Sequence, residues 1–122
     1  MGLDTFASHS PHDIELNDED LQAFQEANIE LCGGIFSGNG NDGSFRGKVY
    51  VIMIADITGQ NLFKGWIPPE TVREMYASLM ACDPDKVFRE NFWYGCIQED
   101  LLELRKFFRV CSEHNLGLLN SG

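Results

Sequence analysis

The chain has 122 residues, of which 43% are hydrophobic, enough for one domain of ordinary size with its own core. Its 9 Lys and Arg residues against 19 Asp and Glu residues give a formal charge of −10. The 2 Trp, 3 Tyr and 9 Phe residues exclude a disordered acidic tail, because such tails are poor in aromatic side chains. The charge also argues against a nucleic-acid-binding protein, since a polyanion selects for clustered Lys and Arg.

The acidic residues are concentrated at the start of the chain. Residues 1–45 contain no Lys or Arg and nine acidic residues, a formal charge of −9, whereas residues 46–122 hold all nine basic residues and ten acidic ones, a charge of −1. Two interpretations stay open: these acids pack beside the basic residues of the same domain, or they form a face that binds a basic partner protein. The nine acidic residues are Asp4, Asp13, Glu15, Asp18, Glu19, Asp20, Glu26, Glu30 and Asp42.

No segment of the chain indicates export or membrane insertion. The first residues lack the basic and apolar regions of a signal peptide, and the longest apolar run, Val49–Ala55, is far shorter than the roughly 18–20 residues of a membrane span. The four cysteines, Cys32, Cys82, Cys96 and Cys111, include no Cys-x-x-Cys pair and are too few for a disulfide framework. We therefore predict a cytoplasmic protein with reduced, largely buried thiols and no membrane contact.

The first third of the chain predicts a strand and then a helix. Residues 3–8 alternate loosely between apolar and polar side chains and predict a short strand. Asn17 is typical of a helix N-cap, and three carboxylates follow it in the first turn, where they meet the positive end of the helix dipole. Apolar residues continue at helical spacing to Leu31, so we expect a helix over 18–31 that Gly33 and Gly34 end.

The pattern of residues 46–58 fits two structures. Its continuous apolar and β-branched stretch favours a buried strand. However, four residues also share one helical face, Val49, Ile52, Met53 and Ile57, and Gly59 suits a helix C-terminus. Both interpretations stay open.

The last half of the chain predicts three helices and a final strand. Pro68-Pro69 and Asp83-Pro84 are typical helix starts and predict helices over about 70–81 and 84–91. A third helix over about 98–113 has acids early and bases late, the order that the helix dipole favours. The tail at 117–120 suits an edge strand.

Together these elements predict an α+β fold. We expect a single helix-dominated domain over residues 1–122, with three to four helices and a few short strands.

The glycine-rich segment before Arg46 is a candidate anion site. Its Gly38-x-Gly40-x-x-Gly43 spacing formally matches a dinucleotide fingerprint, but the preceding strand and the acid about 20 residues later are missing. A loop rich in Gly and Asn can still point backbone N–H groups at an anion, with Ser44, Arg46 and Lys48 as its ligands. The alternative is an ordinary surface loop, and we predict no cofactor.

Two histidines near the start of the chain form a candidate metal site. His9, His12 and Asp13 place two imidazoles and one carboxylate within five residues, and these groups are common metal ligands. A zinc site would need one or two further ligands from elsewhere in the chain. The alternative is a surface turn with exposed histidines.

Three aromatic residues are candidates for an interface. Trp and Tyr are enriched at the centres of protein interfaces, which singles out Trp66, Trp93 and Tyr94. The run from Phe92 to Tyr94 cannot turn all its rings to one side, so one ring is expected to be exposed. The alternative is that these rings pack in the core.

No set of residues has the spacing of a catalytic site. The sequence therefore predicts a non-catalytic protein-interaction module, comparable to an inhibitor, antitoxin or immunity protein, whose partner is a basic protein. The alternative is a small-ligand-binding protein or enzyme that uses loop 37–48 to hold an anionic group. We expect neither nucleic acid nor a membrane as partner, and the sequence leaves a homodimer open.

Overall fold

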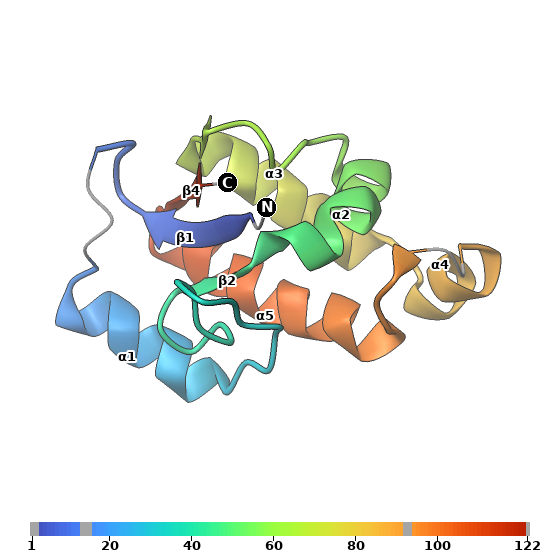
Figure 1. The fold of residues 1–122 in the computed structure, drawn as a ribbon, viewed down its shortest axis with the longest axis horizontal. Helices are drawn as coiled ribbons and strands as arrows, with labels where there is room; N and C mark the ends of the chain where they lie inside the picture. The colour runs from blue at the N-terminus through green and yellow to red at the C-terminus, as the bar shows by residue number, and fades with distance from the viewer. Residues whose placement is uncertain (1–2, 13–15, 92–93, 122) are drawn as a thin grey trace.

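The protein is an α+β domain, as predicted, with five α-helices and a four-stranded sheet (Figure 1). The computed structural model describes residues 3–12, 16–91 and 94–121. The elements in chain order are β1 (Asp4–Ser8), α1 (Asp18–Ala27), β2 (Ser44–Arg46), the 3₁₀ helix η1 (Gly47–Tyr50), α2 (Val51–Thr58), β3 (Trp66–Ile67), α3 (Pro69–Ala81), α4 (Pro84–Glu90), α5 (Gln98–Glu113) and β4 (Gly117–Ser121).

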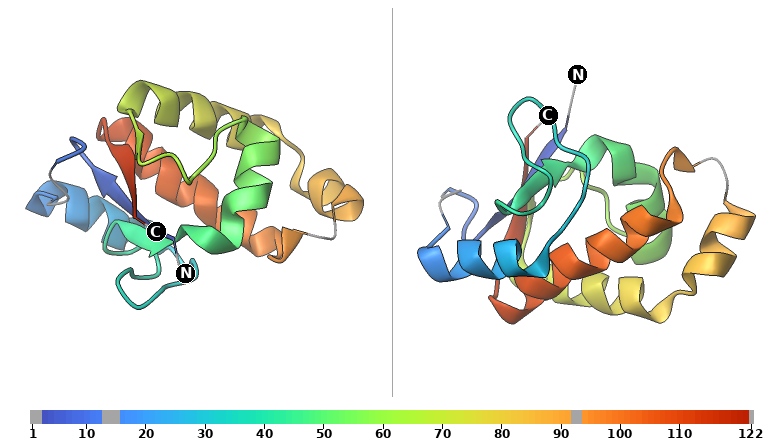
Figure 2. Two further views of the ribbon diagram at one scale, coloured as in Figure 1. Left: turned by 45° about the horizontal axis from the view of Figure 1, so that its top comes forward. Right: turned by 90° about the horizontal axis from the view of Figure 1, so that it is seen from below.

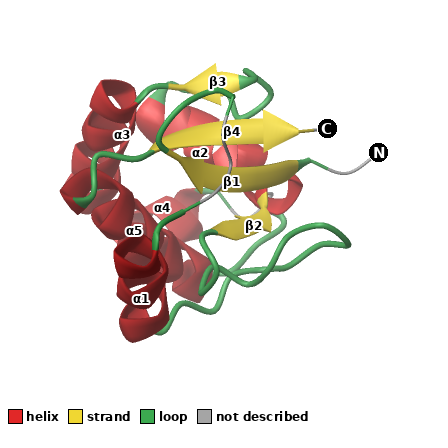
Figure 3. Cartoon of the chain, turned by 90° about the vertical axis from the view of Figure 1, so that its left-hand side faces the viewer, coloured by secondary structure: helices red, strands yellow, loops and turns green. Residues whose placement is uncertain are grey.

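The sheet is antiparallel and has the strand order β2-β1-β4-β3. Figure 3 shows the strands side by side in this order, with the helices beside and behind them. Residues Ala7, Phe45, Ile67 and Leu118 are buried and belong to the sheet face that packs on the helices. On the helical side, α3 and α5 lie next to each other along the domain (Figure 2).

A cluster of aromatic rings joins the N-terminal helix to the sheet and to α5. The ring centroid of Phe107 lies 4.9 Å from that of Phe24 and 4.8 Å from that of Phe45, and all three rings are fully buried. Such aromatic pairs add stability beyond the apolar area that they bury. The acidic first part of the chain is therefore packed into the core through α1.

Helix α1 begins where predicted but is shorter than predicted. The Asn17 side chain accepts a hydrogen bond from the Asp20 backbone N–H at 2.8 Å, which confirms the N-cap. The helix ends at Ala27 because Asn28 adopts a left-handed conformation with φ of 53°, a C-terminal role that Asn fills after Gly. The helix predicted over 18–31 is therefore wrong in its last turn.

The open question over residues 46–58 is settled in favour of a helix. After η1, α2 runs from Val51 to Thr58, and Gly59 ends it with a φ of 75°. The strand interpretation of this segment is wrong. Apolar continuity arises instead because Met53 and Ile54 are buried in the core while Val51 and Ile57 pack partly against it.

The C-terminal strand has a different place from the one predicted. Strand β4 pairs with β1 on one side and with β3 on the other, so it lies inside the sheet and is not an edge strand. Thr5 donates a side-chain hydrogen bond to Asn120 across this pair at 2.7 Å. The first and last strands therefore pair at the middle of the sheet.

The three helices predicted in the second half are confirmed. The Asp83 side chain caps α4 by accepting the Asp85 N–H at 3.1 Å. At the C-terminus of α3, the Arg105 guanidinium donates to the carbonyls of Leu79 and Cys82, each at 2.8 Å. The Leu79 carbonyl also accepts a weak hydrogen bond from the Cys82 thiol at 3.3 Å. Arg105 therefore links α5 to the C-terminal end of α3.

Candidate functional site

The segment between α1 and β2 forms an arm, which we define as residues 29–43. Its two sides are joined by the Ile29 N–H, which donates to the Asn41 side chain at 2.7 Å, and by the Leu31 N–H, which donates to the Asn39 carbonyl at 2.7 Å. Near the end of the arm, the Gly34 N–H donates to the Ser37 carbonyl at 3.1 Å. In Figure 3 the arm extends to the right of β2.

The tip of the arm carries two large apolar side chains in solvent. Ile35 is 92% exposed and Phe36 is 79% exposed. The base of the tip is fastened to the sheet, because the Ser37 hydroxyl donates to the Asp4 carboxylate at 2.6 Å. The Gly34 N–H donates to the same hydroxyl oxygen at 3.1 Å.

Gly34 leaves room for the Asp4 carboxylate beside the tip. A Cβ atom at this position would lie 2.7 Å from the Asp4 carboxylate oxygen, so a larger residue would push this carboxylate away from the Ser37 hydroxyl. The tip therefore combines exposed side chains with a backbone held in place by hydrogen bonds.

The predicted anion ligands differ in their exposure and hydrogen bonding. Ser44 is buried, and its hydroxyl donates to Asp42 at 2.8 Å while accepting the Gly38 N–H at 2.9 Å. Arg46 and Lys48 are exposed. Neither the groove between α1 and α5 nor the one beside α2, α3 and α4 is lined by these three residues. The anion site stays a prediction, without support from the position of Ser44.

A buried carboxylate links two histidines from distant parts of the chain. Asp20 is 2% exposed. One of its oxygens lies 2.7 Å from His9 Nε2, and the other lies 2.9 Å from His114 Nδ1. The three residues come from the chain after β1, the first turn of α1 and the end of α5. This cluster was not predicted, because the sequence separation between Asp20 and His114 gives no signal of their contact.

The environment of Asp20 favours its charged form. Burial by itself raises the pKa of this carboxyl group, but the hydrogen bonds with His9 and His114 outweigh burial and lower its pKa below the ordinary value of 3.8. Asp20 is therefore a carboxylate at neutral pH and the acceptor in both hydrogen bonds. We infer that each histidine presents an N–H group to it.

The candidate metal site receives no support from the described residues. His9 is engaged with Asp20, and His12 lies in the exposed turn after β1. Within the ranges 3–12, 16–91 and 94–121, no group of three His, Cys, Asp or Glu residues is placed to hold a metal ion. Asp13 lies outside the described residues, so the complete predicted set is not tested.

The three candidate interface aromatics have different environments. Trp66 is half-buried, and its ring lies over Gly117, where a Cβ atom would be 2.6 Å from the indole. Tyr94 is buried in the core, which was the alternative interpretation, and burial with the nearby Asp56 raises its pKa to about 12. Trp93 lies outside the described residues.

The four cysteines are free thiols, but their burial was predicted only in part. Cys111 is buried, and burial raises the pKa of its thiol above the ordinary range. Cys82 and Cys96 are half-buried, whereas Cys32 is exposed. The prediction of largely buried thiols is therefore wrong for Cys32, which lies at the base of the arm and follows the shortened α1.

The structure shows how the acids of residues 1–45 are used within the domain. Of the nine acids, Asp13 and Glu15 are outside the described residues, which leaves seven. Three of these seven are used inside the fold: Asp4 by Ser37, Asp20 by its histidines and Asp42 by Ser44. The other four are exposed on α1 and at the base of the arm: Asp18, Glu19, Glu26 and Glu30.

No Lys or Arg in the described part of the chain forms an ion pair with any of these seven acids. The Lys–Glu and Arg–Glu pairs observed are Lys106–Glu103 and Arg109–Glu113, both within α5. The exposed carboxylates of α1 therefore keep their charge available to solvent and to other molecules.

A shallow groove separates α1 from α5 beside His114. It has a volume of about 430 Å³, and Ala23, Ala27 and Val110 form its apolar part. Two acids and two bases, Glu26, Glu113, Lys106 and Arg109, also line it. Because these formal charges cancel, the groove favours neither anionic nor cationic small ligands.

Comparison of the chain with protein-family models, with curated proteins and with solved structures found no match.

The helices of the described residues are all too short or too polar to cross a lipid bilayer.

Proposed function

We propose that this chain is a non-catalytic protein-interaction module whose acidic first part attracts a basic partner protein. The observation that carries the proposal is that the exposed carboxylates of α1 and the arm base have no Lys or Arg partner among the described residues. Asp18 and Glu19 also meet the positive end of the helix dipole of α1, and this leaves their carboxylates exposed to a partner.

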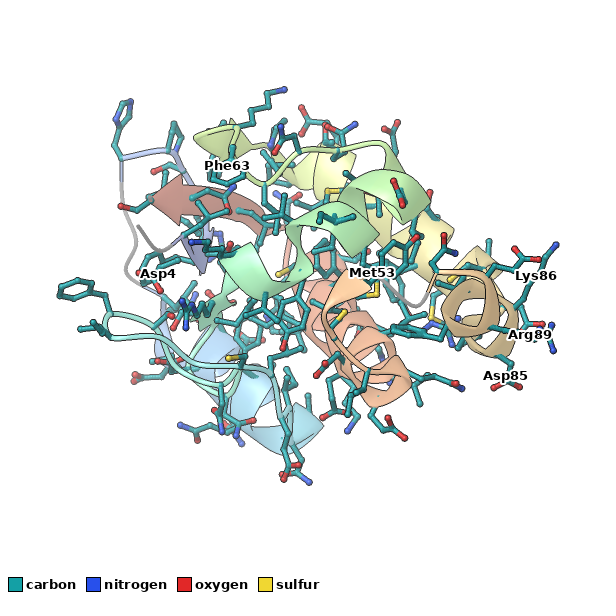
Figure 4. The ribbon with its side chains drawn as sticks, turned by 45° about the vertical axis from the view of Figure 1, so that its right-hand side comes forward. Asp4, Met53, Phe63, Asp85, Lys86 and Arg89 are labelled. Carbon is teal, nitrogen blue, oxygen red and sulfur yellow. The ribbon has the colours of Figure 1, made fainter. Side chains whose placement is uncertain are left out.

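The distribution of charge along the molecule supports this proposal. Helix α1 and helix α4 lie at opposite ends of the long axis (Figure 1). The side chains of Lys86 and Arg89 on α4 extend into solvent at one end, far from Asp4 at the other (Figure 4). Lys86 and Arg89 are therefore too distant to screen the acids of α1, although Lys106 and Arg109 share a groove with Glu26.

The physical benefit of such a surface is faster and more selective association. A patch of one sign steers a partner of the opposite sign during diffusion and suppresses binding of like-charged molecules. We place this activity in the cytoplasm, because four free cysteines suit a reducing compartment.

The proposal is tested by crosslinking inside the cells that produce the protein. A photo-reactive phenylalanine analogue replaces Gln22, an exposed residue on the acidic face of α1, or Ala77, an exposed residue on α3 as a matched control. We expect a basic protein to be crosslinked from position 22 and not from position 77. Identical products from both positions would contradict the proposal.

Measurements on the purified proteins then test whether the charge of α1 drives the association. The variant Asp18→Asn/Glu19→Gln/Glu26→Gln removes three charges from α1, and Glu70→Gln/Glu74→Gln/Glu90→Gln removes three exposed charges elsewhere. We expect the first variant to slow association with the crosslinked protein about 10-fold at low salt, and the control to change it far less. Equal effects of both variants would reduce the proposal to a non-specific influence of net charge.

A further inference from the structure

We propose that Ile35 and Phe36, at the tip of the arm, are the apolar anchor that enters a pocket on the basic partner protein. This inference rests on the proposed function and names the part of the surface that holds the partner after the acids have attracted it.

The exposure of the tip is unusual within this molecule. Large apolar side chains are often exposed singly, as Phe63 and Met80 are on separate elements of this chain. Ile35 and Phe36 differ because they are adjacent, more exposed than the other exposed apolar side chains of the described residues, and placed at the end of a projecting arm. Anchors at interface centres are large apolar or aromatic side chains that fill a pocket on the partner.

The arm presents the tip in a fixed orientation. The Ser37 hydroxyl bonds to Asp4, and the Gly34 N–H bonds to both the hydroxyl and the carbonyl of Ser37. At the base, Ile29 and Leu31 are buried in the core. An anchor that is ordered before binding loses less conformational entropy on association. The hydrogen bonds of the arm therefore have a use beyond the stability of the domain.

The charge of the arm selects a basic protein as the occupant. Residues 29–43 include Glu30 and Asp42 and no Lys or Arg, and the exposed Arg46 of β2 lies beside the arm at Gly34. An anionic membrane surface attracts basic segments, whereas residues 1–45 carry a formal charge of −9. A second copy of the chain carries the same charge of −10, so two acidic first parts would repel each other at low salt. A basic protein with an apolar pocket meets both features of the arm.

The anchor is tested with a photo-reactive phenylalanine analogue in place of Phe36, and with the same analogue in place of Phe63 as control. Phe63 is 62% exposed and lies in the loop before β3, at the sheet edge opposite β2. We expect position 36 to crosslink the same basic protein as position 22 does, and position 63 to miss it. The Ile35→Ser change should weaken the crosslink from position 36.

Kinetics with the purified crosslinked protein complete the test. We expect Phe36→Ser to speed dissociation about 30-fold or more, the change typical of an interface anchor, while Phe63→Ser leaves dissociation unchanged. Both variants should keep the melting temperature of the native protein, since both rings are exposed. Unchanged dissociation of Phe36→Ser would overturn the anchor.

Failure of the anchor and failure of the proposed function give different results. In one outcome, Phe36→Ser binds the basic protein with the native dissociation rate while neutralisation of α1 slows association. In that case the proposed function is supported and the anchor is contradicted. The native chain could instead bind vesicles of phosphatidylcholine with phosphatidylglycerol, and Phe36→Ser could lose this binding. That result would show that the tip inserts into a membrane and not into a protein pocket. Crosslinks from position 36 to the chain itself would replace it by a second copy. Either result overturns the inference.

Discussion

Residues 1–45 and residues 46–122 are held in place by different means. In the first part, side chains of Asn, Asp and Ser satisfy the backbone of the arm and of α1: Asn41 bonds to the Ile29 N–H, and Asn17 bonds to the Asp20 N–H. In the second part, helices α2, α3 and α5 pack through apolar faces, and polar side chains such as Arg105 bond to the backbone at helix ends. One apolar core joins the two parts, since Phe24 and Phe45 belong to it, but the arm of the first part depends on single polar side chains for its backbone hydrogen bonds.

This difference indicates which side chains the fold leaves available for binding other molecules. In the second part, Glu103 and Glu113 pair with Lys106 and Arg109 along α5. The first part fixes its backbone with short polar groups and leaves Asp18, Glu19 and the arm tip free for other molecules. We expect substitutions of these polar side chains to destabilise the first part locally without unfolding the second part.

The largest effect is expected where the two parts meet. Phe107→Ala removes a fully buried ring that contacts both Phe24 and Phe45. We expect it to lower the free energy of unfolding by about 3–5 kcal/mol, the range for loss of a large core side chain. Urea denaturation measures this change. A loss below about 1 kcal/mol would mean that the aromatic cluster does not join α1 to the rest of the core.

The next largest effect is expected at Asp20. Asp20→Asn keeps the shape of the side chain but removes the charge that accepts hydrogen bonds from His9 and His114. We expect a loss of about 2 kcal/mol at neutral pH, since hydrogen bonds to charged groups are stronger than neutral ones. Glu30→Gln, at an exposed acid of the same part, is the matched control and should leave the denaturation midpoint unchanged.

The pH dependence sharpens the test of Asp20. Because the folded state lowers the pKa of Asp20 below 3.8, its stabilising contribution is fully present above about pH 4 and is lost as the pH falls through the folded value. The difference in stability between the native protein and Asp20→Asn should therefore shrink below about pH 4. A difference that grows on acidification would show that the carboxylate is not the stabilising form.

In the second part, Arg105 is a polar side chain that holds backbone groups in a comparable way. Arg105→Ala removes the two hydrogen bonds that the guanidinium donates to the last carbonyls of α3. We expect a loss of about 1–2 kcal/mol, with faster hydrogen exchange at the C-terminus of α3. Arg89→Ala, at an exposed arginine of α4, should change neither measurement. No change for Arg105→Ala would mean that water replaces the guanidinium at no cost.

The smallest effect on global stability is expected inside the arm. Asn41→Ala removes the acceptor of the Ile29 N–H and is expected to lower stability by about 1 kcal/mol. The Ile29 amide should exchange faster with solvent, while amides of α5 stay protected. Equal acceleration in α5 would contradict the dependence of the arm on single polar side chains.

Much of the second part could be predicted from the sequence, because helical spacing and caps are local signals. The helices that follow Pro68 and Asp83 and the one over residues 98–113 were confirmed with nearly the expected bounds. Residues 46–58 were ambiguous because a fully apolar run fits a buried strand and a buried helix equally well. Burial alone could not separate the two.

The first part was predicted less well, because its decisive contacts are distant in sequence. The end of α1 depends on the left-handed conformation of Asn28 and on arm residues that supply the next hydrogen bonds. The contact of His114 with Asp20 gives no local signal. The arm tip was overlooked, although an apolar pair between Gly34 and Ser37 has no periodic element to bury it. That pattern is the sequence feature that could have indicated an exposed anchor.

The most direct test of the account measures association and dissociation rates separately for the purified chain and the protein that it crosslinks. We predict that neutralising Asp18, Glu19 and Glu26 slows association about 10-fold at low salt and leaves dissociation unchanged. Ile35→Ser/Phe36→Ser should do the reverse, with faster dissociation and nearly unchanged association. If both sets of substitutions leave both rates unchanged, neither the acidic surface nor the arm tip contributes to binding, and the account is wrong.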